Sequence, residues 1–164
     1  MADDEIVSRL RASLAGRESP PPASAEELAG AERRIGQAIP PFLRRLYLEV
    51  ADGGFGPGHG VKGIGRHPRA RLYEDICDFL YARGPAPDSN LSGFVEIYDW
   101  GCAVVSLVDF TDPGAPMWAI DNGFLFPEDV SLREWITMSL DGTLRMPCAE
   151  DHPECATIWD FERA

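Results

Sequence analysis

The chain has 164 residues, 45% of them apolar and 26% charged, which is the composition of one soluble globular domain with a single core. Its formal net charge is −12. Residues 83–164 carry 15 acids and 4 bases, a net of −11, whereas residues 1–82 carry 12 acids and 11 bases, a net of −1. This field disfavours nucleic acid and anionic membrane as partners and favours a basic protein, although solubility alone is the simpler explanation of the charge.

The acidity is concentrated in one long stretch of the second half. No lysine or arginine occurs from residue 84 to residue 132. The acids in that stretch are Asp88, Glu96, Asp99, Asp109, Asp112, Asp121, Glu128 and Asp129. We therefore expect any acidic binding surface to lie in this part of the chain.

The sequence indicates a cytoplasmic protein. No apolar run reaches the length of a membrane-spanning helix, and the acidic N-terminus lacks the basic and apolar regions of a signal peptide. In the cytoplasm the four cysteines are expected to be reduced. They are Cys77, Cys102, Cys148 and Cys155.

Three helices are predicted before residue 52. Apolar residues at helical spacing favour a helix over 3–15, and Ser24 with Glu27 forms a capping box that begins a second helix. Pro40-Pro41 interrupts the pattern and begins a third helix, because proline fits the first helical turn. The residues expected to face the core are Ile6, Val7, Leu10, Leu14, Leu28, Ala31, Ile35, Leu43, Leu46, Tyr47 and Val50.

A glycine-rich loop follows the third helix. Asp52-Gly53-Gly54 ends the helix, and seven glycines lie between residues 53 and 65, so the backbone there is expected to be unusual. Residues 58–63 also fit G-x-G-x-x-G, which in dinucleotide-binding proteins follows a strand and opens a helix. Here a helix precedes the motif, which favours a structural loop over a cofactor site.

The rest of the chain reads as one more helix, a strand meander and a closing helix. A helix is predicted over 69–83 and another over 131–140, the latter with Leu132, Trp135, Ile136 and Leu140 buried. Four strands are predicted, with an antiparallel pair about the turn at 111–114, over residues 94–98, 102–108, 117–120 and 124–126. Helices followed by strands predict a single α+β domain, with an antiparallel sheet flanked by helices. The packing of residues 143–164 is left open.

No residue set specifies catalysis or metal binding. Cys148, His152 and Cys155 lie close together, but structural zinc needs a fourth ligand, which would come from Cys102 or His67. We favour ordinary thiols, and we expect Cys102 to be a small buried residue of its strand. No G-x-S-x-G elbow occurs. The sequence therefore predicts a protein that is not an enzyme and has no cofactor.

Several short motifs occur in a characteristic order. They are Ser-Ala-Glu-Glu-Leu at 24–28, Ile-Pro-Pro-Phe-Leu at 39–43, Ala-Asp-Gly-Gly at 51–54, Asp-Trp-Gly-Cys at 99–102 and Ser-Leu-Arg-Glu-Trp-Ile at 131–136. This order resembles the SUKH superfamily, of Smi/Knr-like cell-wall regulators and bacterial immunity proteins. The family usually has Leu-Pro and Asn-Gly-Gly where Ile39 and Asp52 stand here. The resemblance covers about residues 24–142.

The resemblance implies one SUKH-like α+β domain over 1–164 and a role in binding. Many bacterial members neutralise a cognate toxin protein, often a nuclease, by direct contact, and the family has no common catalytic residues. The expected partner is such a toxin with a basic surface, not nucleic acid or membrane. The alternative is an adaptor or regulatory protein-binding module without a toxin. Tryptophans suit hot spots, although each is more often a core residue. The expected partner-binding residues are Asp52, Asp99, Trp100, Asp109, Asp112, Trp118 and Asp121.

Overall fold

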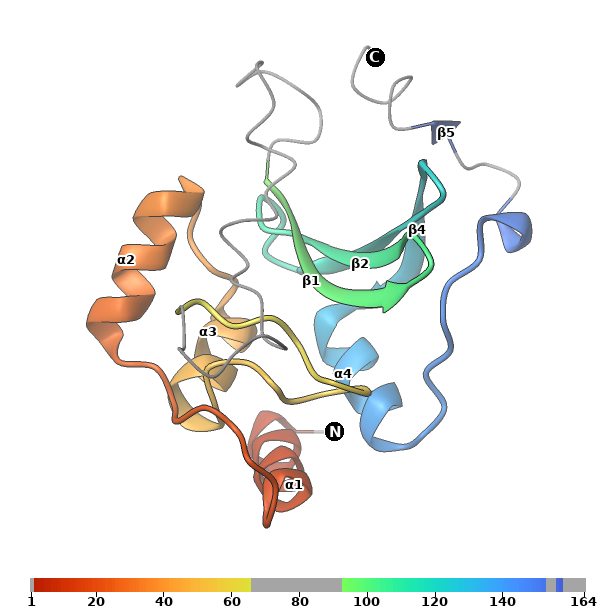
Figure 1. Cartoon of the computed structure of the whole chain (residues 1–164). Coiled ribbons are helices and arrows are strands. Elements are labelled where there is room, and N and C mark those ends of the chain that lie inside the picture. Colours follow the sequence, from red (N-terminus) through yellow and green to blue (C-terminus); the bar gives the residue numbers. More distant parts are fainter. Residues whose placement is uncertain (1, 66–92, 153–155, 158–164) are drawn as a thin grey trace.

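The computed structural model describes residues 2–65, 93–152 and 156–157 (Figure 1). In these ranges an antiparallel sheet carries helices on one face, which confirms the predicted single-domain α+β class. The helices are α1 (Asp3–Leu14), α2 (Ala25–Ile35), α3 (Pro41–Glu49) and α4 (Leu132–Leu140). None of the described helices is long and apolar enough to cross a membrane.

The sheet is a meander in chain order. The order is β1 (Phe94–Gly101), β2 (Val104–Asp109), β3 (Pro116–Asp121), β4 (Phe124–Ser131) and the short β5 (Ala156–Thr157), and every adjacent pair is antiparallel. The predicted pairing across the turn at 111–114 is confirmed, because Leu107 lies opposite Trp118. Strand β4 is longer than predicted and runs directly into α4. The predicted helix over 69–83 lies outside the described residues.

The hairpin between β1 and β2 corrects one prediction. Cys102 and Ala103 form a turn with positive φ of 55° and 67°, and β2 begins only at Val104. Cys102 is therefore an exposed turn residue, and the expectation of a buried strand cysteine was wrong. The hairpin between β3 and β4 turns at Asn122-Gly123, also with positive φ at both residues, which is the favoured pairing for this turn.

Local sequence signals place the helices as predicted. Ser24 and Ser131 both form capping boxes, in which the carboxylates of Glu27 and Glu134 accept a hydrogen bond from the backbone N–H of the cap serine. Pro41 occupies the first turn of α3. The predicted apolar stripes are confirmed as buried, except that Leu14 and Leu140 at helix ends are half-buried.

Alternation along the strands divides the apolar residues between two faces of the sheet. Val95, Ile97, Val108 and Met117 join the helices in the main core. The opposite face carries a second, smaller cluster, with half-buried Val105 and Trp118 against it: Phe94, Leu107, Ile120 and Leu125. One face of the sheet therefore supports the core, while the other includes a tryptophan near the surface.

The glycine loop closes on itself beside β1. Gly54 and Val61 are joined by a backbone hydrogen bond of 2.8 Å, and the Lys62 amide donates to the Ile97 carbonyl at 2.8 Å. Gly60 has φ +95°, and a Cβ there would lie 2.2 Å from Gly54. The unusual backbone expected of this loop is thus confirmed, and helix α3 precedes it along the chain.

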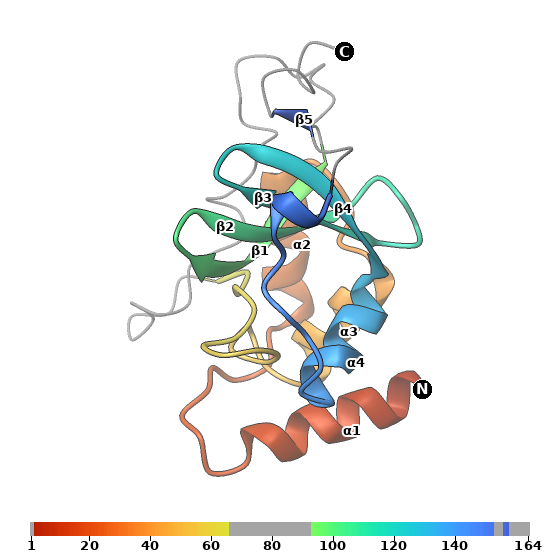
Figure 2. The same cartoon turned by 90° about the vertical axis from the view of Figure 1, so that its right-hand side faces the viewer.

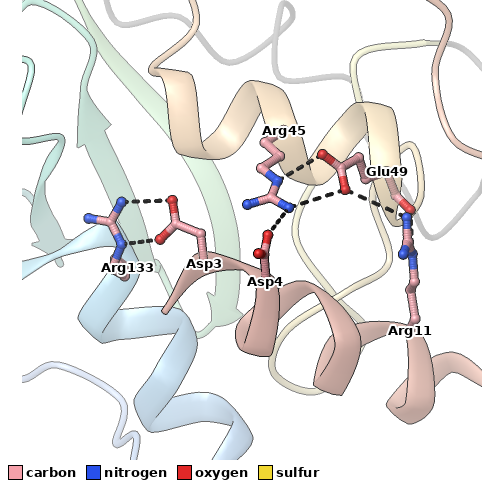
Figure 3. Close-up of polar contacts among 6 residues, drawn as sticks. All are labelled: Asp3, Asp4, Arg11, Arg45, Glu49 and Arg133. Atoms are coloured by element: carbon pink, nitrogen blue, oxygen red, sulfur yellow. Dashed lines mark hydrogen bonds and ion pairs between the residues drawn. The ribbon is translucent and has the colours of Figure 1, made fainter. Parts of the chain in front are cut away.

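Helix α1 lies below α3 and α4, on the side away from the sheet (Figure 2). Ile6, Val7 and Leu10 bury its apolar stripe. Figure 3 shows the ion pairs around this contact: Asp3 accepts two hydrogen bonds from Arg133, at 2.6 and 3.1 Å, and Asp4 pairs with Arg45. Arg45 and Arg11 both pair with Glu49 of α3. The helix is therefore fixed by apolar burial, with exposed ion pairs at its margins.

Candidate protein-binding groove

A surface groove of about 410 Å³ lies where β2 ends and β3 begins. Three carboxylates line it, from Asp109, Asp112 and Asp129, and its apolar wall includes Trp118 and Pro127. No lysine or arginine is among the lining residues within the described part of the chain. We call this feature the Trp118 groove.

Two of the carboxylates are held by their own turns. Asp109 Oδ1 accepts from the amide and hydroxyl of Thr111, at 2.8 and 2.6 Å, and Asp112 Oδ1 accepts from the Gly114 amide at 2.7 Å. In the described structure Oδ2 of each has no hydrogen-bond partner. One oxygen of each carboxylate thus fixes its orientation, and the other remains able to accept from a ligand.

The third carboxylate comes from a bulge in β4. Trp118 lies opposite Pro127, and Pro116 opposite Ser131, so one residue of β3 faces three of β4. Asp129 has φ +55° in this bulge, a conformation that aspartate tolerates better than most residues. The backbone turn places Asp129 in the lining of the groove. Sequence reasoning did not select Asp129 as a site residue, although it was among the acids of the arginine-free stretch.

Trp118 packs against a second aromatic side chain. The Phe94 ring packs edge-on against Trp118, with ring centroids 5.2 Å apart and planes at 81°. Trp118 is half-buried, so part of its ring is covered while it still lines the groove. An aromatic face beside carboxylates attracts a cation through both the ring quadrupole and direct charge.

The structure brings together three of the seven predicted site residues: Asp109, Asp112 and Trp118. Asp99 and Asp121 lie at the opposite end of the strands, next to Val105 and Val104 of β2. Asp99 accepts from the Gly101 amide, and Asp121 accepts from the Ala149 amide at 2.9 Å. The Asp121 contact ties residues after α4 to the sheet.

Asp52 and Trp100 both make hydrogen bonds within the domain. Asp52 is only 1% exposed, and its carboxylate accepts from the amides of Ile64 and Gly65 at 2.6 and 3.1 Å. These hydrogen bonds close the glycine loop, and the burial of Asp52 removes it from any binding surface. Trp100 is half-buried and donates from Nε1 to Ser106 Oγ at 2.9 Å.

A polar network under the sheet was not foreseen from the sequence. Ser106 Oγ donates to Glu128 Oε1 at 2.6 Å, and burial raises the pKa of Glu128 to about 7. The nearby Trp135 indole N–H opposes that rise in pKa. Trp135 Nε1 is nevertheless buried without a hydrogen bond of normal geometry in the described residues. The strand alternation that points Glu128 inward was the only available signal for this network.

The residues considered for a metal site do not form one in the described part of the chain, where no three His, Cys, Asp or Glu side chains are grouped to hold an ion. His152 stacks on Phe126, with ring centroids 4.4 Å apart. Cys148 is half-buried. Cys155 and His67 lie outside the described residues.

No family model matches the chain, and no curated protein matches it. A function is therefore inferred from the fold class, the Trp118 groove and the order of the sequence motifs.

Proposed function

We propose that this protein is an immunity protein, which binds a cognate bacterial toxin by direct contact and neutralises it in the cytoplasm, without catalysis of its own. The observation that carries the proposal is the Trp118 groove, where Asp109, Asp112 and Asp129 surround an aromatic wall and no base is found among the described lining residues. The toxin-binding role itself comes from the resemblance of the sequence motifs to SUKH immunity proteins.

The charge of the groove fits a basic partner. Complementary charge steers diffusional encounter and raises association rates well above those of uncharged surfaces. A nuclease toxin must bind phosphates, so its active cleft is basic, and carboxylates at this groove would take the place of those phosphates. Trp118 supplies apolar contact area of the kind found at the centre of binding surfaces.

A rescue experiment tests this function. The toxin domain encoded beside this gene is expressed in a host that lacks the protein, alone and together with it. The proposal predicts rescue of growth together with co-purification of the two proteins. Loss of growth in both cases, or rescue without a complex, would contradict direct neutralisation.

A charge-matched pair of variants locates the surface. Asparagine keeps the turn hydrogen bonds of Asp109 and Asp112 and tolerates the positive φ of Asp129, so the triple Asp→Asn variant removes charge without changing local geometry. The control removes three exposed acids elsewhere, as Glu5→Gln, Glu150→Gln and Asp151→Asn. Rescue should fail with the groove variant and persist with the control.

The adaptor alternative is separated by the same experiment. A neighbour that is not toxic, together with a stable complex between this protein and some other protein, would support an adaptor. In that case the groove variant should lose the complex without any effect on growth.

A further inference from the structure

A second, smaller hollow lies next to the Trp118 groove. It has a volume of about 90 Å³ and is lined mainly by Pro40, Pro41, Phe42, Pro113 and Leu132. Gly114 lines both the hollow and the groove. We call it the Pro41 hollow. The two sites therefore lie on either side of one short turn.

The chemistry of the Pro41 hollow differs from that of the groove. Among the described residues, the one charged side chain in its lining is Arg133. Its guanidinium pairs with both oxygens of Asp3 and lies 4.8 Å from the centre of the Phe42 ring. The charge of Arg133 is thus balanced, and the other side chains that line the hollow are apolar. A hollow of this size suits a small apolar side chain.

The ridge between the two sites is fixed by hydrogen bonds. The Ala115 amide donates to the Asp112 carbonyl at 2.9 Å and closes the turn, and the Leu132 amide donates to the Ala115 carbonyl at 2.9 Å. Ala115 is 5% exposed and has φ +48°, so the surrounding structure holds it in a conformation that costs energy. The relative placement of groove and hollow is therefore set before any partner binds.

We propose that the Trp118 groove and the Pro41 hollow together bind one extended segment of the partner protein, with an arginine in the groove and a small apolar residue in the hollow. This inference rests on the proposed protein-binding function and adds the chemistry of the bound segment. Arginine fits better than lysine, because its planar guanidinium pairs with two carboxylate oxygens at once. Alternate side chains of an extended segment lie about 7 Å apart on one side, so the proposed segment carries its two anchors at positions i and i+2, the shortest spacing that places both on one side.

A titration with blocked peptides tests the inference without the toxin. The probe is acetyl-Gly-Arg-Gly-Val-Gly-amide, followed by amide and indole chemical shifts of the full chain. We expect shifts confined to the groove, the Trp118 indole and the hollow, with a dissociation constant in the millimolar range. A citrulline peptide has the same shape without the charge and should bind at least about fivefold more weakly.

Two protein variants separate the sites. The triple variant Asp109→Asn, Asp112→Asn and Asp129→Asn should weaken the arginine peptide at least about fivefold, while the Glu5, Glu150 and Asp151 control should not. Pro113→Trp, at an exposed turn position, covers the hollow. It should abolish the preference for valine over glycine at the second anchor and keep the preference for arginine over citrulline. Dispersed spectra confirm that each variant is folded.

Several results would overturn the inference. These are equal binding of the arginine and citrulline peptides, shifts located on another face, and equal weakening by the groove and control variants. Shifts that depend on protein concentration alone would assign the surface to a second copy of the chain. If the peptides do not bind but the rescue succeeds, the immunity function is supported and the toxin binds a different surface. If the arginine peptide binds as expected but the rescue fails, the chemistry of the bound segment is supported and the proposal that the partner is a toxin is rejected.

Discussion

Ser106 on β2 and Glu128 on β4 form a hydrogen bond of 2.6 Å across the intervening strand β3. Ala119 of β3 lies opposite Ser106, and its small side chain leaves the path open. The contact places a carboxyl group under the sheet beside Trp100 and Trp135. Burial there raises the pKa of Glu128 to about 7, from an ordinary value of 4.5.

The raised pKa makes stability depend on pH. Between pH 4.5 and 7 the folded protein binds more protons at Glu128 than the unfolded chain, so this group lowers stability as pH rises through that window. Glu128→Gln removes the effect and keeps an acceptor for Ser106. We expect the variant to gain about 1 to 3 kcal/mol over the wild type at pH 8 and little at pH 5, measured by urea unfolding.

Glu134 is the matched control for that measurement. The Ser131 backbone N–H donates to its carboxylate and lowers the pKa of Glu134. Glu134→Gln should therefore destabilise the protein most at neutral pH, and the difference should shrink as pH falls below about 4. A Glu128→Gln variant with this same trend would contradict the assignment.

Asp52 is predicted to be a stability residue. Asp52→Ala would leave the buried amide of Ile64 and the amide of Gly65 without their acceptor. Each unsatisfied buried amide costs about 1 to 3 kcal/mol, so a loss of about 2 to 4 kcal/mol in the free energy of unfolding is expected. Thermal and urea unfolding check this. Peptide binding at the groove, measured below the unfolding transition, should be unchanged.

A comparison of Gly16 with Gly60 distinguishes the energetic cost of positive φ from the cost of steric collision. Gly60 and Gly16 both have positive φ, +95° and +79°, but a Cβ at Gly60 would lie 2.2 Å from Gly54, and at Gly16 no atom lies within 4 Å. Gly16→Ala should cost about 1 kcal/mol from conformation alone. Gly60→Ala should cost about 3 kcal/mol or more, because the loop must open. Equal losses of unfolding free energy would show that the loop is not closed.

The contact between Asp3 and Arg133 should contribute little to stability. Both side chains are partly exposed, at 34% and 46%, so a double-mutant cycle with Asp3→Asn and Arg133→Gln should give about 0.2 to 1 kcal/mol. The coupling should fall in 1 M salt. It should also disappear as pH falls through the pKa of Asp3, which Arg133 holds below its usual value. A coupling insensitive to salt would mean that the pair is buried in solution.

Charge reversal at the groove should act on the association rate. With a partner identified by the rescue experiment, Asp109→Lys with Asp112→Lys should slow association about tenfold or more at low salt. The difference should shrink at high salt because the charges are screened. Surface plasmon resonance at two ionic strengths measures this. An unchanged association rate would remove both residues from the interface.

Prediction from the sequence succeeded where the signal is local. The capping boxes of Ser24 and Ser131 each fix a helix start through contacts within four residues, and the apolar stripes follow helical spacing. The hairpin at Asn122-Gly123 has residues that accept positive φ. The turn at Cys102-Ala103 was missed because neither residue favours that conformation, so only the register of β1 with β2 imposes it.

The candidate site was only partly predictable. Asp109, Asp112 and Trp118 were selected from charge and residue type, but so were Asp52, Asp99, Trp100 and Asp121, which the fold places elsewhere. A list of acids has no information about which carboxylates share a face. Strand register supplies it, because antiparallel pairing brings the end of β2 beside the beginning of β3.

The sequence by itself determined the four described helices, most of the described strands, the α+β class and the acidity of the second half. Helical period, capping residues, turn residues and net charge act over a few positions or need no structure. The tertiary structure alone decided that Asp52 is buried, that Asp129 reaches the groove through a bulge, and that Glu128 meets Ser106 across β3. Those outcomes depend on contacts between residues far apart in the chain, and only the folded structure brings such residues together.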